Sequence, residues 1–134
     1  PALGDIDGDG DLDLFSGEAS GTINFWRNAG TATNPSFELV SDEWEGIDVG
    51  RRSSPALVDL DGDGDLDLVI GNEAGELRVW RNQGSPEAPS FVEDPGARLP
   101  RLPYASPTFG DLDGDGALEA ILGNLSGGLG FYRR

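Results

Sequence analysis

The residues Asp-Leu-Asp-Gly-Asp-Gly-Asp-Leu-Asp, numbered 59–67, place five carboxylates within nine positions. Two unpaired charges about 5 Å apart repel by roughly 1 kcal/mol even in water, so this stretch needs a counter-ion. All its side-chain donors are hard oxygens, and its two glycines permit a tight wrap around an ion. We therefore predict a Ca²⁺-binding loop and exclude a zinc or copper site.

The same nine-residue pattern occurs three times, at residues 5–13, 59–67 and 111–119. The seventh position has to supply only its backbone carbonyl, which explains why Ala117 stands where the other copies have Asp11 and Asp65. We expect side-chain ligands at the first, third, fifth and ninth positions: Asp5, Asp7, Asp9 and Asp13; Asp59, Asp61, Asp63 and Asp67; and Asp111, Asp113, Asp115 and Glu119.

An EF-hand loop begins with a similar pattern, but it requires a bidentate Glu at its twelfth position and a helix on either side. The twelfth residues here are Ser16, Ile70 and Leu122, none of which has a carboxylate. The flanking segments are short, bounded by glycine and rich in alternating apolar residues. These features exclude an EF-hand and indicate strands on both sides of each loop.

The composition limits the partners and the chemistry. The chain has 134 residues, with 25 acidic and 9 basic residues and a formal net charge of −16. This acidity argues against nucleic acid and against anionic membranes as partners. Because the chain has neither His nor Cys, it cannot form a Ser-His-Asp or Cys-His catalytic site. The obvious carboxylate pairs are committed to the ion, so we predict a protein that is not an enzyme.

The expected calcium sites indicate a compartment. Sites of this kind in extracellular modules have Kd values on the order of 10⁻⁴–10⁻³ M, too weak to fill in a resting cytosol. We therefore expect an exported protein, secreted or held at the cell surface. The chain starts at Pro1 without an initiator Met, which indicates a processed chain or a fragment. The longest aliphatic run, residues 68–70, is too short to span a membrane.

Each loop lies within a repeat of 52 to 54 residues that predicts four short strands. We expect strands before the loop (residues 1–4, 55–58 and 107–110), after it (14–15, 68–70 and 120–122), and beyond the next turn (21–27, 75–81 and 127–133), with a fourth beginning at 35–37 and 89–91. Four short antiparallel strands per repeat are typical of a β-propeller blade. The predicted fold is all-β, with blades at 1–54, 55–106 and 107–134, the last without its fourth strand.

The repeats resemble the FG-GAP/VCBS family, the blades of integrin-α-type β-propellers. The matching pieces are Ser-Pro-Ala-Leu-x-Asp-Leu-Asp-Gly-Asp-Gly-Asp-Leu-Asp-Leu at residues 54–68 and Gly-x-Leu-x-Val-Trp-Arg-Asn at 75–82. The resemblance implies calcium in the hairpin loop between the first two strands of each blade. It also implies a non-enzymatic extracellular module for recognition, adhesion or assembly, in which calcium is a structural clip.

Two alternatives stay open. Two and three-quarter blades cannot close a ring, so copies of the chain can join blade to blade, or the chain belongs to a longer propeller. The other alternative is a calcium-dependent lectin or an accessory domain of a polysaccharide-active enzyme, with a protein or glycan ligand. Trp44 is the best candidate for a ligand contact, although packing is favoured for it and for the recurring Trp26, Trp80 and Tyr132. Further candidates are the loop arginines Arg51, Arg52, Arg98 and Arg101 and the recurring Arg27, Arg81 and Arg133, although pairing with nearby acids is favoured for all of them. Asn124 begins a glycosylation sequon.

Overall fold

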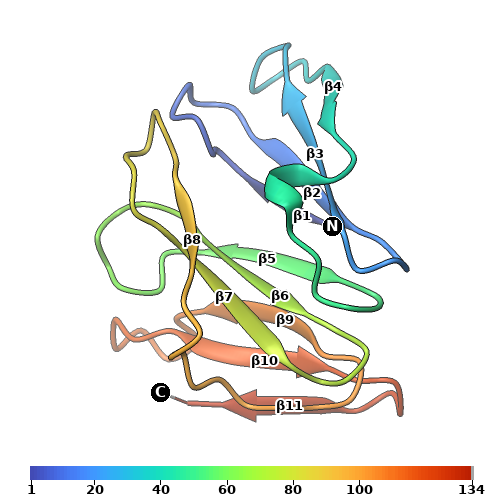
Figure 1. The fold of residues 1–134 in the computed structure, drawn as a ribbon. Helices are drawn as coiled ribbons and strands as arrows, with labels where there is room; N and C mark the ends of the chain where they lie inside the picture. Colours follow the sequence, from blue (N-terminus) through green and yellow to red (C-terminus); the bar gives the residue numbers. More distant parts are fainter. Residues whose placement is uncertain (134) are drawn as a thin grey trace.

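The computed structural model describes residues 1–133, which form three antiparallel sheets (Figure 1). The first sheet contains, in spatial order, β1 (Ala2–Gly4), β2 (Asp13–Gly17), β3 (Ile23–Asn28) and β4 (Phe37–Ser41). The second contains β5 (Ser54–Val58), β6 (Asp67–Gly71), β7 (Leu77–Asn82) and β8 (Phe91–Glu93). The third has three strands within the described residues, β9 (Ser106–Gly110), β10 (Glu119–Gly123) and β11 (Leu129–Tyr132), with β10 in the middle.

The all-β prediction is confirmed, and each observed strand overlaps the range expected from sequence. The strands form because β-branched and aromatic residues alternate between two faces, and glycine-containing turns end each run. The described residues include one short 3₁₀ turn, η1 (Trp44–Gly46), in the connection from the first sheet to the second. Glu45 has a φ of 54° inside this turn, so the backbone changes direction there.

In every sheet an acidic loop joins the first strand to the second. The antiparallel register pairs Gly4 with Asp13, Val58 with Asp67, and Gly110 with Glu119. The acid at the ninth loop position is therefore the first residue of the second strand in each sheet. Because all three loops end in a hydrogen-bonded ladder, their ends are fixed by the sheet.

The first strands of neighbouring sheets lie together: β1 contacts β5, and β5 contacts β9. The hydroxyl oxygens of Ser54 and Ser106, from β5 and β9, are 3.0 Å apart. The last strands, β4 and β8, lie at the opposite edges of their sheets. The three sheets follow one another in chain order from top to bottom in Figure 1.

The first and second sheets bury a large aromatic core between them. Phe15 and Phe25 are opposite each other on β2 and β3, with ring centroids 4.8 Å apart. Trp44 from η1 packs edge-on against Phe15 at 4.9 Å and against Phe91 of β8 at 5.0 Å. Trp80 is also buried in this core. Packing was the favoured role for Trp44, and the structure shows it partly buried against this core. A ligand contact of Trp44 stays a prediction.

The remaining aromatic residues follow the alternation of the third strand. Ile23 and Phe25 face the second sheet, while Trp26 is half-buried on the opposite face of the first sheet. In the second sheet, Val79 faces the third sheet and Trp80 faces the first. Both faces of the second sheet are therefore buried.

The core between the second and third sheets is smaller. Its buried members are Val58, Val69 and Val79, with partly buried side chains such as Phe109 and Leu118 around them. On the outer face of the third sheet, Leu129 is 78% exposed and Phe131 is 56% exposed. This outer face has no covering layer within residues 1–133.

Among the described residues, none of the helical segments has the length and apolarity required to cross a bilayer.

Candidate metal centre

The first carboxylate of each acidic loop organises the loop backbone. The Asp5 carboxylate accepts hydrogen bonds from the N–H groups of Gly8 and Gly10, at 2.8 and 3.0 Å. Asp59 and Asp111 make the same pair of bonds in the other two loops. Gly8 and Gly10 have φ values of 72° and 93°, a region that side chains with a Cβ rarely adopt. The Asp-x-Asp-Gly-Asp-Gly pattern thus fixes the loop through both its acid and its glycines.

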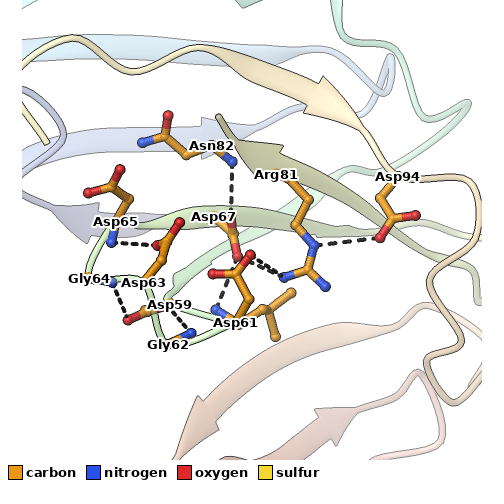
Figure 2. A network of polar contacts seen from close by, with 11 residues as sticks. Asp59, Asp61, Gly62, Asp63, Gly64, Asp65, Asp67, Arg81, Asn82 and Asp94 are labelled. Carbon is orange, nitrogen blue, oxygen red and sulfur yellow. Dashed lines mark hydrogen bonds and ion pairs between the residues drawn. The ribbon is translucent and has the colours of Figure 1, made fainter. Parts of the chain in front are cut away.

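This wrap brings the carboxylates of the first, third and fifth positions together. In each loop, ligand oxygens of these three residues lie within 4.8 Å of one another. Figure 2 shows the second loop, where the three side chains converge on one side of the backbone. The clusters are Asp5, Asp7 and Asp9; Asp59, Asp61 and Asp63; and Asp111, Asp113 and Asp115. Each cluster can hold a metal ion, and its all-oxygen donor set suits a hard cation.

The acid at the ninth position of each loop, here called the ninth acid, was expected to be a fourth side-chain ligand. Its contacts are with other parts of the protein. Asp13, Asp67 and Glu119 are each 1% exposed, and each accepts a bond from the N–H of the second loop residue. The other carboxylate oxygen of Asp13 and of Asp67 accepts from the N–H of Asn28 and Asn82, both at 2.8 Å. The position equivalent to these asparagines in the third repeat is 134, outside the described residues. The ninth acid therefore ties the loop to the third strand, and its role as a ligand stays a prediction.

The seventh position was expected to contribute only its carbonyl. The side chains of Asp11 and Asp65 are largely buried, and the N–H of each donates to the preceding fifth-position acid at 3.0 Å. Burial, followed by the charges of neighbouring loop acids, raises the pKa of both carboxyl groups. Burial also raises the pKa of Asp13, although the N–H groups of Asn28 and Ile6 oppose the shift. The first two loops thus hold three carboxylates whose ionised forms are disfavoured by burial.

An arginine at the end of each third strand contacts the acid at the third position of its loop. The Arg27 Nε lies 3.3 Å from Asp7, and the Arg81 Nη1 lies 3.8 Å from Asp61. Arg133 forms the equivalent ion pair with Asp113. The expectation that these arginines pair with neighbouring acids is confirmed. Each guanidinium neutralises part of the negative charge of its cluster.

Arg81 has the largest set of partners (Figure 2). Its Nη1 donates to the buried Asp67 at 2.9 Å, and its Nε lies 3.5 Å from Asp94. Burial lowers the pKa of Arg81, but the hydrogen bond and charge of Asp67, with Asp61 and Asp94, more than offset this, so its pKa lies above the ordinary value. Arg81 therefore connects the second loop to the segment that follows β8.

Two buried asparagines, Asn28 and Asn82, organise the turns that follow the third strands. The side-chain oxygen of Asn28 accepts from the N–H groups of Gly30 and Ser36, at 3.0 and 2.9 Å. Asn82 makes the same two bonds to Gly84 and Ser90. Each asparagine thus contacts the ninth acid through its backbone and closes the hairpin to the fourth strand through its side chain. The signal available in the sequence was their recurrence next to Arg27 and Arg81.

The other candidate residues lie away from the loops. Arg51 and Arg52 are paired with Glu73 at 3.6 and 3.9 Å, and Arg101 is paired with Glu76 at 3.1 Å. The Tyr104 hydroxyl donates to Glu73 at 2.8 Å, and this bond, together with burial, raises the pKa of Tyr104. Compensation of local acids is thus the observed role of these three arginines. Asn124, in the glycosylation sequon, has a side-chain oxygen that accepts from the N–H of Ser126 at 2.9 Å.

The fold and these loops define a class of all-β repeat proteins in which an acidic hairpin loop opens each sheet. The sequence pattern of the FG-GAP-like repeat matches this chain twice, at residues 5–70 and 59–122. Together the two matches include all three acidic loops, and the chain belongs to the FG-GAP-like repeat family, as its motifs indicated. A comparison with curated proteins gave no match.

Proposed function

We propose that this chain is a non-enzymatic, Ca²⁺-stabilised β-propeller segment that acts outside the cell in recognition, adhesion or assembly. The observation that carries the proposal is the three-carboxylate cluster, which occurs in the same place in all three repeats. Carboxylates within 4.8 Å of one another repel, and a bound cation would offset this repulsion in each of the three repeats. Ca²⁺ is the hard cation that accepts such flexible sets of oxygen ligands.

Unpartnered oxygen atoms in the first loop support the fit. Within residues 1–133, the Oδ1 atoms of Asp7 and Asp11 are buried and have no hydrogen-bond partner. A buried carboxylate oxygen without a partner is costly, and a cation bound by Asp7 would remove that cost for its Oδ1. Asp5, Asp7 and Asp9 would hold the ion in this loop, as would the equivalent clusters in the other two. The ion would supply positive charge that holds the hairpin closed.

The propeller arrangement is supported by the way neighbouring sheets meet. The first strands lie together, the last strands lie at the opposite edges, and the second sheet is buried on both faces. Radial repetition of sheets around a common axis has these properties. The outer faces of the first and third sheets would then each contact a further blade.

Removal of calcium tests the proposal. At free Ca²⁺ about ten times Kd, each filled site adds about 1.4 kcal/mol, so three sites add about 4 kcal/mol. For a chain of this size, that corresponds to a fall in Tm of roughly 15 °C in excess EGTA. Asp63→Asn should remove part of this difference, while Asp42→Asn, an exposed acid outside the loops, should leave it unchanged. An equal Tm with calcium and with EGTA would contradict the proposal.

A second candidate function, self-assembly blade to blade, is favoured by the exposed apolar residues at the two ends of the stack. Leu129 and Phe131 project from the outer face of the third sheet, and Leu3 and Leu39 are exposed on the first. A repeat unit of the same architecture is the surface best shaped to cover them. Light scattering should then show concentration-dependent oligomers that Phe131→Lys abolishes. A monomer at all concentrations up to about 100 μM, the range in which weak contacts of this size appear, would exclude self-assembly.

A further inference from the structure

The two interfaces between sheets are built on the same plan but are filled differently. In the first interface, Phe15 and Phe25 face each other across β2 and β3, and Trp44 covers them. In the second interface, the cross-strand pair at the same positions is Val69 and Val79. The segment connecting the second sheet to the third, residues 94–105, contains no tryptophan. Val69 and Val79 therefore stand in place of Phe15 and Phe25, and the connecting segment contributes the smaller Ala97 and Leu99 to this interface.

A cavity of about 240 Å³ lies at this place between the second and third sheets. Its apolar wall includes Val79 from β7 and Phe109 from β9, with Leu118 and Tyr132 from the third sheet's loop and outer strand. A dry cavity of about 150 Å³ is enough to bind benzene, so this one has room for a larger planar ring. The cavity is partly open to solvent, so a ligand can enter it and contact Phe109 and Tyr132.

The lining of the cavity includes three arginines. Arg81, Arg98 and Arg133 all line it. Arg81 and Arg133 are engaged by loop acids, whereas exposed Arg98 forms no ion pair or hydrogen bond with any residue in 1–133. A guanidinium without a carboxylate partner is unusual here, because acids outnumber bases 25 to 9 in the chain. Arg98 therefore offers a planar pair of donors to an incoming carboxylate.

We propose that this cavity binds a small planar aromatic carboxylate. Its ring system lies between the second and third sheets, where Trp44 lies between the first and second, and its carboxylate pairs with Arg98. The lining explains the specificity: apolar side chains accept the ring, and the single unpaired arginine accepts one negative charge. Arg98 contacts none of the loop acids, whereas Arg81 and Arg133, which also line the cavity, contact Asp61 and Asp113 of the metal clusters.

Titration with indole-3-acetate, followed by ¹H–¹⁵N NMR in saturating calcium, tests the proposal. We expect saturable shifts at Val79, Phe109 and Tyr132, with a Kd of about 1 mM or tighter for a ligand of this size. Neutral indole and cationic tryptamine should bind at least about fivefold more weakly, because they lack the charge-assisted hydrogen bond. The Trp26 and Trp44 signals should not move.

Variants separate the ring contact from the charge contact. Arg98→Ala should weaken indole-3-acetate binding about five- to tenfold, whereas Arg101→Ala, a matched arginine paired with Glu76 outside the cavity, should leave it unchanged. Ala97→Trp places an indole in the cavity and should abolish binding while raising Tm. If Ala97→Trp does not fold, Leu99→Phe fills the same cavity from the neighbouring position.

Three results would overturn the proposal. The first is the absence of shifts at about 10 mM indole-3-acetate, well above the expected Kd. The second is binding that Arg98→Ala and the filling variants leave unchanged. The third is the same pattern of shifts on concentrating the protein without any probe, because a second copy of the chain would then be the occupant.

Discussion

Asp67→Asn is the substitution that best separates the structural role of the ninth acid from its predicted role as a calcium ligand. The Asp67 carboxylate is 1% exposed and accepts from Asn82 N at 2.8 Å, Leu60 N at 3.1 Å and Arg81 Nη1 at 2.9 Å. An asparagine keeps the shape but replaces one oxygen with an NH₂ group that faces a donor. The substitution therefore leaves at least one buried N–H without an acceptor.

The expected cost can be estimated from these contacts. A buried donor left unsatisfied costs about 2 kcal/mol. Loss of the charge opposite Arg81 adds about 1 kcal/mol, a value reduced because the guanidinium is partly exposed and retains Asp61 and Asp94 as partners. Asp67→Asn should thus lower the free energy of unfolding by about 3 kcal/mol. The matched variant Asp13→Asn, which has the two backbone bonds but no arginine bond, should cost about 2 kcal/mol.

Equilibrium urea unfolding, followed by far-UV circular dichroism, measures both values. The measurement is made in calcium-depleted buffer and again in about 2 mM calcium, above the Kd range of extracellular sites. If the ninth acid ties the loop to the third strand, both variants are destabilised even without calcium. A cost below about 1 kcal/mol in calcium-depleted buffer, or a larger loss for Asp13→Asn than for Asp67→Asn, would refute the reasoning.

Two further predictions concern residues outside the loops. Trp44→Ala should lower the free energy of unfolding by about 3 kcal/mol, because it opens a cavity among three phenylalanine rings. Trp26→Ala, on the open face of the first sheet, should lower it by only about 1 kcal/mol. Equal losses would argue against the packed position of Trp44. Ultraviolet titration should find the pKa of Tyr104 above the ordinary value of about 10, because its hydroxyl donates to Glu73 and ionisation would lose that bond. Glu73→Gln should bring this pKa down, and an unchanged titration curve would show that Glu73 is not the cause.

The candidate site was largely predictable because local chain chemistry fixes it. Asp5, Gly8 and Gly10 form their hydrogen bonds within six residues, so the spacing alone specifies the loop. The contacts of Arg81 were predicted only in part. Pairing with nearby acids was expected, but the identity of its three partners depends on how β7, the loop and the segment after β8 meet in space.

The sequence by itself determined the all-β repeat, the strand positions, the acidic loops and membership of the FG-GAP-like repeat family, because alternation and turn residues act over a few neighbouring positions. Tertiary structure alone decided that the ninth acid faces Asn28 and Asn82, and that Arg98 lines a cavity. These outcomes depend on contacts between residues far apart in the chain. The space between two sheets is either filled by a ring or left open, depending on the volumes of the side chains that meet there. Those side chains come from distant parts of the chain, so a local sequence pattern does not predict the outcome.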